Sequence, residues 1–202
     1  MVHKYLVPAI VLTYNWSMSI EIWVDADSVP TNLRQIILRV AARLCCKCCF
    51  VADRELSDVR QFIAENTFSL RQKAREEGET DPEVIRSVRS KIRMDVVSTG
   101  ENSADDFIVE NAPESSLCIT HDIPLAARLL EKGCTVIDDR GGKYTKDDIK
   151  AKLSDRLVNQ ELRSWGVYAE QQGKIDSSRQ KKFANMLDTT IAHMTTETKE
   201  EK

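Results

Sequence analysis

The feature that most constrains the fold is a repeated pattern, in which a short apolar run is followed by a stretch with helical spacing. Residues 20–24 form such a run, and apolar side chains then recur every three or four positions through 33–44. Further runs occur at 48–52, 96–98, 117–120 and 134–137, with helical stretches at 104–111 and 125–132. Strands that alternate with crossover helices are typical of a parallel sheet, so we predict an α/β fold.

Two segments lie outside this alternation. Residues 57–93 are rich in charge and carry apolar side chains at helical spacing, which predicts an inserted helical hairpin that turns near 78–82. Helices are also expected from Thr145 onward, the last of them at 179–194, followed by a disordered tail at 195–202 that has nothing to bury.

The first nineteen residues are expected to lie outside the fold, which we place at 20–194 as a single domain. Their apolar run, from Tyr5 to Leu12, contains Pro8 and is far shorter than the roughly 20 residues needed to cross a bilayer. A non-native extension, with Met18 as the true start, and a targeting segment are the two interpretations. No other stretch is expected to contact a membrane.

Charge and cysteine usage exclude several classes of protein. The 29 Lys and Arg nearly balance 32 Asp and Glu, so the chain is neither a histone-like polycation nor an acidic tail. Four of the six cysteines crowd into 45–49, too close for a disulfide framework, which favours a reducing, cytoplasmic compartment. A zinc site there would need a second Cys or His pair that the sequence lacks, so we expect these cysteines in the core.

Aspartates follow the predicted strands where ligands gather in such sheets. Asp25 and Asp27 come directly after the first run, Asp122 follows a later one, and Asp105 and Asp106 begin a helix. The carboxyl ends of parallel strands meet at one edge, so we expect these carboxylates to converge and to repel one another without a cation. All-oxygen sites suit Mg²⁺ or Mn²⁺, which activate water for attack on a phosphodiester.

Helix capping is the alternative role for these aspartates. Asp27 or Ser28 can cap the first helix, and Asp122 can cap a later one. The pair of acids that begins the middle helix also stabilises the dipole of that helix. Asp25 comes too early to cap a helix well, so it favours a functional site.

Five stretches of the sequence also resemble a known family. In chain order they are IWVDAD at 22–27, SADDFIV at 103–109, ITHDIPLA at 119–126, DRG at 139–141 and FANMLD at 183–188. On these motifs the chain resembles the largely uncharacterised YaiI/YqxD-like family, which is grouped with PIN-like nuclease domains. It differs from that family in its longer charged insert, its Cys-rich segment and the loop 166–173, which lacks the typical Gly-Gly-Pro.

The resemblance implies a three-layer α/β/α PIN-like domain with an acidic pocket for Mg²⁺ or Mn²⁺. PIN-like domains are typically metal-dependent ribonucleases, although some members have lost activity. By this resemblance Asp25, Asp106 and Asp122 would ligate the metal, while Asp27 and Asp105 would ligate it or orient the attacking water.

Four further residues are expected around these acids. Ser28 and Thr120 would hydrogen-bond them, and Asp139 is an additional acid of second rank. His121, which precedes Asp122, either assists proton transfer or simply faces solvent.

Basic side chains are the candidates for holding a phosphate backbone. Four Lys or Arg lie within 86–93 with no acid among them, and residues 140–182 carry eleven Lys or Arg against six Asp or Glu. Solvated helix faces are the alternative interpretation of both groups. Among the aromatic side chains, Tyr144 and Trp165 can stack bases, whereas Trp23 is expected in the core. The predicted nucleic-acid contacts are Arg86, Arg89, Arg93, Arg140 and Lys143.

These features together predict a divalent-metal-dependent nuclease that hydrolyses phosphodiester bonds, with RNA as the expected substrate. A non-catalytic nucleic-acid-binding or regulatory PIN-like protein is the first alternative. A phosphatase that uses Asp25 as its nucleophile is the second, and it lacks a matching downstream lysine. The sequence predicts neither the RNA sequence preference nor the oligomeric state.

Overall fold

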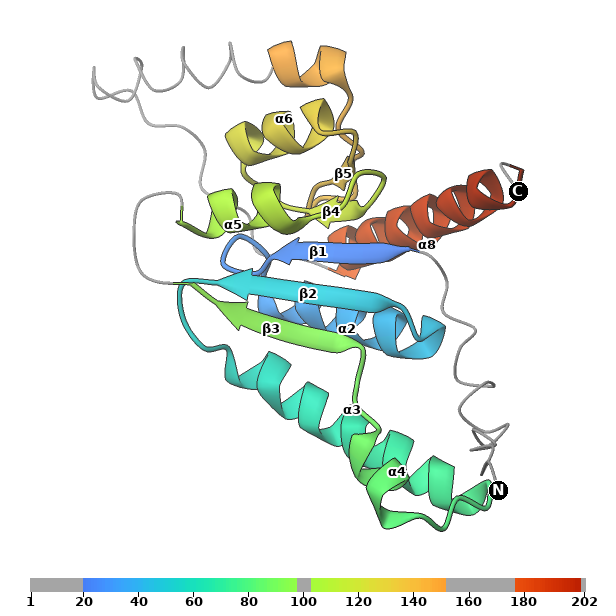
Figure 1. Ribbon diagram of the computed structural model, residues 1–202. Coiled ribbons are helices and arrows are strands. Elements are labelled where there is room, and N and C mark those ends of the chain that lie inside the picture. The colour runs from blue at the N-terminus through green and yellow to red at the C-terminus, as the bar shows by residue number, and fades with distance from the viewer. Residues whose placement is uncertain (1–19, 98–102, 152–176, 201–202) are drawn as a thin grey trace, which may run out of the picture.

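A five-stranded parallel sheet forms the centre of the protein (Figure 1). The computed structural model describes residues 20–97, 103–151 and 177–200. The strand order is β3-β2-β1-β4-β5, and every neighbouring pair is parallel. This arrangement confirms the predicted α/β class. The strands are β1 (Glu21–Asp25), β2 (Lys47–Ala52), β3 (Ile92–Val96), β4 (Leu117–Ile119) and β5 (Thr135–Ile137).

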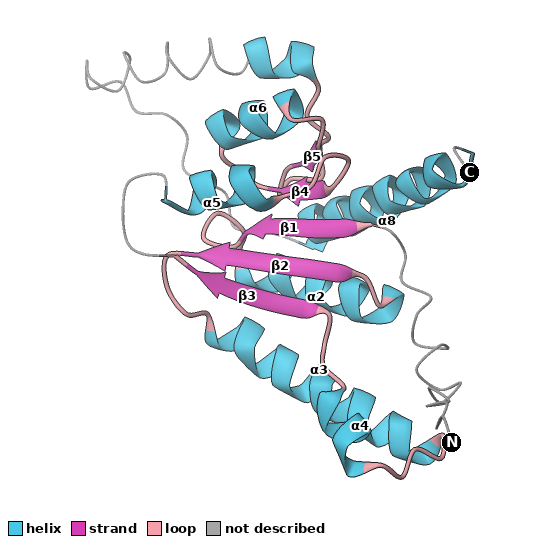
Figure 2. Cartoon of the chain, viewed as in Figure 1, coloured by secondary structure: helices cyan, strands magenta, loops and turns pink. Residues whose placement is uncertain are grey.

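Helices cover both faces of this sheet, which gives three layers (Figure 2). On one face α2, α3 and α8 pack against the strands, and on the other face α5 and α6 do so. The helices are α2 (Thr31–Leu44), α3 (Ser57–Glu76), α4 (Pro82–Ser87), α5 (Ser103–Asn111), α6 (Ile123–Glu131) and α8 (Ser177–Glu200).

The central strand β1 is buried on both sides, because its alternate side chains enter two separate cores. Ile22 and Val24 face α2 and α8, while Trp23 faces α5 and α6. Trp23 is 1% exposed, which confirms its predicted place in the core, and its ring lies 6.4 Å from that of Phe107. A strand with two buried faces reads as a continuous apolar run, which is how it appears in the sequence.

The order of the strands reverses direction next to β1. The chain passes from β1 to β2 and β3 on one side, and then crosses to β4 and β5 on the other. Val24 pairs with Ile119 in the parallel register, so Asp25 and Thr120 stand side by side at the carboxyl ends of β1 and β4. A reversal of this kind opens the crevice in which open α/β sheets bind ligands.

The third strand begins earlier than predicted. The sequence places it at 96–98, whereas β3 runs from Ile92 to Val96. Ile92 and Met94 are 3% and 5% exposed and pack into the core beside α2, so alternation with Arg93 and Asp95 hides the strand signal in the sequence.

The predicted helical hairpin is present but uneven. Its first limb, α3, is a long helix, and the chain turns through Gly78, whose φ is +97°. The second limb, α4, contains only six residues and is capped by the side chain of Asp81, which accepts a hydrogen bond from Glu83 N. Ile92, which seemed to continue its apolar spacing, belongs to β3 instead.

The last helix continues beyond its predicted end. We expected disorder from Thr195, yet α8 extends to Glu200. The hydroxyl of Thr195 donates to the carbonyl of Ile191 one turn earlier, and Thr196 bonds in the same way to Ala192. A helix already docked through its earlier turns adds further residues at low cost, because only nucleation is expensive.

The cysteine cluster lies largely in the core, as the sequence predicts. Cys46, Cys48 and Cys49 are each 1% exposed. Burial raises the pKa of the Cys46 thiol to about 11, so it is protonated at neutral pH. Cys45 ends α2 in the left-handed region, with a φ of 48°.

Several predicted segments fall outside the described residues. These are the leader at 1–19, the loop at 166–173 and Trp165. Within the described ranges, no helix combines the length and the apolar character that a bilayer span requires.

Candidate active site

The hydroxyl of Thr120 joins two of the predicted aspartates. It donates to Asp25 Oδ2 at 2.7 Å and accepts from the backbone N–H of Asp122 at 2.9 Å. Thr120 is 1% exposed, so this short chain of hydrogen bonds is shielded from water. It fixes the acid at the end of β1 relative to the loop that follows β4.

Ser28 makes a second bridge between the same two loops. Its hydroxyl donates to the backbone carbonyl of Asp25 at 3.1 Å and accepts from the backbone N–H of His121 at 3.1 Å. The structure therefore places both predicted hydroxyl residues where they position acids. Ser28 does not cap α2, whose N-cap is Pro30 and which has no side-chain cap.

Asp25, Asp105 and Asp122 form one electrostatic cluster, which we call the acidic triad. Burial raises the pKa of Asp25, against the hydrogen bonds from Thr120 and Ser28 that lower it. Burial also raises the pKa of Asp105 to about 6, and the charges of Asp25 and Asp122 add to that shift. Residues almost a hundred positions apart in the chain are thus close enough to repel one another.

Asp27 and Asp106 point toward arginines instead. Asp27 accepts from the backbone N–H of Asp53 at 2.7 Å and lies 3.4 Å from the guanidinium of Arg54. Asp106 pairs with Arg128 of α6 at 2.7 Å and is largely exposed. These two predicted acids border the triad and pair with cations of the chain, yet the charge of Asp27 still raises the pKa of Asp25 and that of Asp106 still raises the pKa of Asp105.

Asp122 has a structural role as well as its place in the triad. It is the N-cap of α6, and its Oδ2 accepts from the backbone N–H of Leu125 at 3.1 Å. The capping alternative is therefore correct for this residue. Its position at the helix end brings its charge close enough to Asp105 to raise the pKa of that residue.

A buried ion-pair network lies beside the triad. Asp139 has a 4% exposed side chain, its Oδ1 lies 3.0 Å from His121 Nδ1, and its Oδ2 bonds to the guanidinium of Arg179. Arg179 Nε also donates to the Asp139 carbonyl at 3.3 Å. Although burial acts to raise it, the pKa of Asp139 is held below its usual value by His121 and Arg179.

The loop after β5 carries two of the predicted basic residues to this edge. Asp138 accepts from the backbone N–H groups of Arg140 at 2.9 Å and Gly142 at 2.6 Å, which folds the loop tightly. Arg140 and Lys143 are exposed on it. Tyr144 is 4% exposed, so it is part of the core and does not offer a face for stacking bases.

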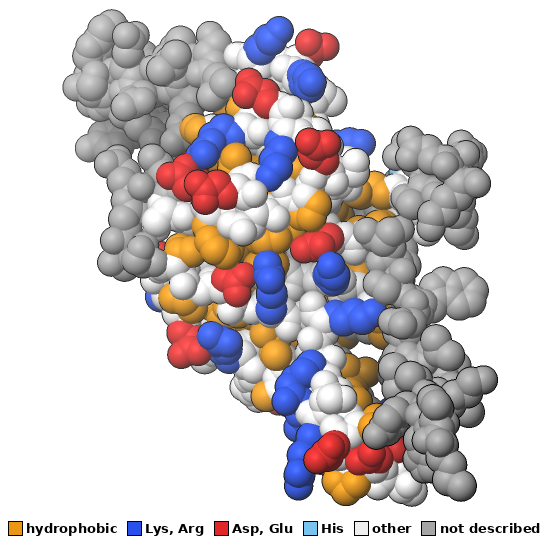
Figure 3. Space-filling model, in the orientation of Figure 1, with side chains coloured by type: hydrophobic (Ala, Val, Ile, Leu, Met, Phe, Trp, Pro, Cys, Tyr) orange, Lys and Arg blue, Asp and Glu red, His pale blue; other side chains and the backbone are white. Residues whose placement is uncertain are grey.

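The other predicted basic residues lie elsewhere. Arg86 and Arg89 belong to α4 and the turn after it, at the far end of the 20-residue helix α3, roughly 30 Å along its axis. Arg93 of β3 lies 5.2 Å from the ring centroid of Trp23 and pairs with Asp95, so it lies on the face of the sheet and not at the carboxyl ends of the strands, where the acids gather. On the face shown in Figure 3, basic and acidic side chains are interspersed.

The donor chemistry of the acidic triad fits a hydrated magnesium or manganese ion. All its donors are oxygens, and the charges of Asp25 and Asp122, which add to the effect of burial on the pKa of Asp105, are of the sign that attracts a cation. Within the described residues no group of three or more His, Cys, Asp or Glu side chains is placed to hold a metal ion, so this part of the chain would supply at most two such ligands. Magnesium keeps several of its waters and takes one or two carboxylates, so two carboxylates are enough for it. A structural zinc site needs four protein ligands, which the described residues do not bring together here.

The structure adds residues that the sequence did not predict. Arg54, Arg128 and Arg179 each pair with an acid at the site, and they come from the loop after β2, from α6 and from α8. Single arginines on polar helix faces give no pattern that marks a site. The doublet Asp138-Asp139 directly after an apolar strand was the signal available for the buried network.

Asp105→Asn is expected to flatten the dependence of stability on pH between about 4 and 6. The folded state raises the Asp105 pKa above 3.8, so its contribution is fully present below pH 4 and is lost as pH rises to about 6. The loss is about 1 kcal/mol, because the group is partly exposed and solvent screens it. Urea unfolding at several pH values measures it. An unchanged slope in the variant would contradict the electrostatic cluster.

Sequence comparison places the chain among uncharacterised bacterial proteins. The family model described as "Uncharacterized BCR, YaiI/YqxD family" matches residues 80–193. A "UPF0178 protein" of Citrifermentans bemidjiense is 34% identical over 177 residues, which are 88% of this chain and 97% of the relative. One from Treponema denticola is 34% identical over 172 residues (85% and 92%), and one from Trichlorobacter lovleyi is 33% identical over 180 (89% and 99%). No solved structure matches the chain.

Proposed function

We propose that this chain, which belongs to the uncharacterised YaiI/YqxD family, hydrolyses phosphodiester bonds in RNA, and that its acidic triad does so with Mg²⁺ or Mn²⁺. The observation that carries the proposal is the Thr120 hydroxyl, which holds Asp25 against the start of the Asp122 loop. Burial of the Asp25 carboxylate raises its pKa, which means that its charged form costs stability, and helix capping explains only Asp122.

Helix capping and ion pairing, the alternative roles of these acids, do not explain why Asp25 is buried. Asp25 is 6% exposed, caps no helix and forms no ion pair among the described residues. Proteins bury an unpaired carboxylate beside other acids mainly where a cation or a reaction requires it. The crevice formed by the reversal of strand order is also the usual ligand site of an open parallel sheet.

Each acid of the triad has a distinct task in this proposal. Asp25 and Asp122 would hold the metal, which when bound neutralises phosphate charge and acidifies a coordinated water. Asp105, on the opposite side in α5, would accept a hydrogen bond from the attacking water and orient it. Asp106 and Asp27, paired with Arg128 and Arg54, would shape the rim rather than ligate.

Arg140 and Lys143 would bind the RNA backbone. They are exposed on the loop after β5, at the same edge as the acidic triad, whereas Arg86 and Arg89 are too distant to share one short strand with it. A positive loop beside an acidic pocket attracts a polyanion and places its phosphate near the metal. Binding through two cations is weak, and its dependence on salt is modest because the log–log slope scales with the number of phosphates contacted; we expect a slope of about −1.4 for single-stranded RNA.

The decisive experiment measures cleavage of labelled single-stranded and structured RNA with Mn²⁺, Mg²⁺ or EDTA. We expect metal-dependent cleavage by the wild type and at least about 100-fold less by the double variant Asp25→Asn/Asp122→Asn, which corresponds to about 3 kcal/mol of lost transition-state stabilisation. Asp188→Asn is the matched control, because Asp188 is an exposed acid on α8 paired with Arg43. It is expected to cleave like the wild type.

Other results would identify the alternatives. RNA binding without cleavage under every metal condition would establish a non-catalytic binding protein. Metal-dependent turnover of a small phosphate monoester, with no cleavage of RNA, would favour the phosphatase that uses Asp25 as nucleophile. Cleavage that survives the double variant would contradict the proposed site.

A further inference from the structure

A second site lies at the opposite edge of the sheet. A cavity of about 250 Å³ is enclosed by the end of α2, by α3 and by the segment from α4 to β3. Cys45 and Cys46 line it just before β2 begins, and Lys91 lines it just before β3 begins. The cavity therefore faces the amino ends of the strands, whereas the acidic triad lies at their carboxyl ends.

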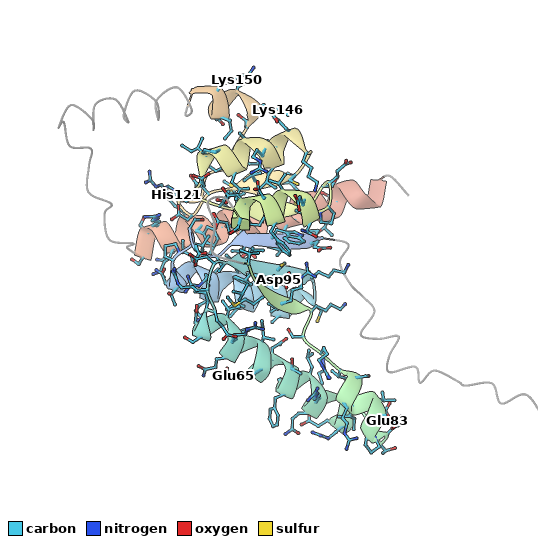
Figure 4. All side chains as sticks on the ribbon, turned by 60° about the vertical axis from the view of Figure 1, so that its left-hand side comes forward. Glu65, Glu83, Asp95, His121, Lys146 and Lys150 are labelled. Atoms are coloured by element: carbon cyan, nitrogen blue, oxygen red, sulfur yellow. The ribbon has the colours of Figure 1, made fainter. Side chains whose placement is uncertain are left out.

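The two sites are well separated in space. Figure 4 shows His121, which borders the acidic triad, on the body of the domain, and Glu83 of α4 at the far end of the arm formed by α3 and α4. The cavity belongs to that arm and to the end of α2. No residue of the acidic triad or of its neighbouring network lines it. A ligand there would not depend on the proposed nuclease activity.

The wall of the cavity is mostly apolar. Small and branched side chains line it, among them Ala41, Ala42, Leu70, Ala74, Val84 and Ile92. Three of the helices contribute, and several of these residues are alanines, so the space results from small side chains where the helices meet. An apolar cavity of about 150 Å³ holds benzene in other proteins, so this volume suits a slightly larger apolar group.

Glu79 is the exception in this wall. It is 8% exposed, and its Oε1 accepts a hydrogen bond from the backbone N–H of Asp81 at 2.9 Å. Its Oε2 is buried and accepts no hydrogen bond from any described residue. Burying a carboxylate oxygen without a hydrogen-bond donor costs free energy of folding. A positively charged donor would recover more of that free energy than a neutral one.

The chain's own cations do not fill this role. Arg89 and Lys91 also line the cavity, but Arg89 Nη1 donates to the backbone carbonyls of Val88, at 3.0 Å, and of Arg86. Neither residue forms an ion pair with Glu79 among the described parts of the chain. Lys91 is only partly buried, so water can solvate its charge, whereas Glu79 Oε2 is buried and belongs to a residue of the cavity wall.

From these observations we propose that the cavity binds an organic ammonium ion, with the apolar body of the ligand in the cavity and its ammonium on Glu79. The ligand class is a primary amine that carries a short alkyl chain or a single ring. The apolar wall supplies affinity through burial, and the carboxylate supplies selectivity because it rejects ligands without a positive donor.

Isothermal titration of the full chain with n-hexylamine, hexan-1-ol and hexanoate tests the proposal, because the three probes share one chain and differ in charge. We expect the wild type to bind n-hexylamine at least about tenfold tighter than hexan-1-ol, as a charge-assisted hydrogen bond in a buried site provides. In the Glu79→Gln variant, the affinities for n-hexylamine and hexan-1-ol should differ by no more than about twofold. Glu76→Gln, a change of an exposed acid on the last turn of α3, should leave the preference unchanged.

Two further measurements keep the proposal testable if Glu79→Gln does not fold. The comparison of the three probes needs only the wild type, and Ala42→Leu fills the cavity from α2 and should abolish binding of n-hexylamine. Equal affinity for n-hexylamine and hexan-1-ol would overturn the role of Glu79. Tightest binding of hexanoate would assign the site to Lys91 and an anionic ligand, and no binding of any probe would exclude a ligand site of this class.

Discussion

Asp25→Asn is expected to raise the midpoint of thermal unfolding by about 2–4 °C at pH 8 while RNA cleavage falls at least about 100-fold. Burial and the neighbouring Asp27 both disfavour the charged form of Asp25, and this is why its pKa is raised. Asparagine removes that charge and keeps an oxygen that accepts the hydrogen bond from Thr120. A gain of about 1 kcal/mol produces this shift in a chain of this length.

Calorimetry and the RNA assay on the same preparation measure both effects. Asp188→Asn again serves as the control, because the exposed pair of Asp188 with Arg43 contributes little to stability. A lower midpoint for Asp25→Asn in metal-free buffer would contradict the expected cost of burying this charge. A higher midpoint with full cleavage would leave the acidic triad as an electrostatic feature without a catalytic role.

Arg179→Met is expected to reduce the free energy of unfolding by about 3 kcal/mol. Asp139 has a 4% exposed side chain, and this change leaves its charge with His121 alone. Removing one partner of a buried ion pair costs about 3–5 kcal/mol, and we take the lower end because Arg179 is partly exposed. Urea unfolding near pH 7 measures the loss.

Arg43→Met is the matched control for this change. It breaks the Arg43–Asp188 pair, which also joins α8 to the rest of the domain but is exposed on both sides, so less than about 1 kcal/mol is expected. The pKa of Asp139 is lowered in the folded state, so its contribution is present above the ordinary value of 3.8 and is lost as pH falls through the folded pKa. Equal effects of the two variants at pH 7 would contradict a buried network.

The sequence predicts the fold well because each central strand is buried on both faces. Ile22, Trp23 and Val24 read as one apolar run, and the helical stripe of α2 follows at once. β3 is an outer strand of the sheet with Arg93 exposed, so its alternating pattern also fits a helix and the sequence places the strand too late. The sequence predicts too short a helix for α8, because the polar composition of its last residues does not show that its earlier turns are packed against the core.

For the candidate site, the sequence identifies the residues but not their partners. The acids at strand ends are visible because parallel strands bring their carboxyl ends together. Which of them pair with arginines depends on residues distant in the chain, so the sequence alone groups Asp27 and Asp106 with Asp25 although Arg54 and Arg128 bind them. The roles of Asp25, Asp105 and Asp122 in metal binding and catalysis stay predictions.

The position of α8 has a consequence for biosynthesis. Phe183, Leu187 and Ile191 of this helix fill the core that α2 shares with the sheet, and Arg179 completes the Asp139 network, yet α8 follows every strand in the chain. While the ribosome is still making the earlier segments, the face of the sheet that α2 and α3 cover lacks its last helix, and the network lacks its arginine. Stable folding of this domain therefore waits until α8 has left the exit tunnel, and a nascent chain that stalls before residue 177 would be a target for chaperones and proteases.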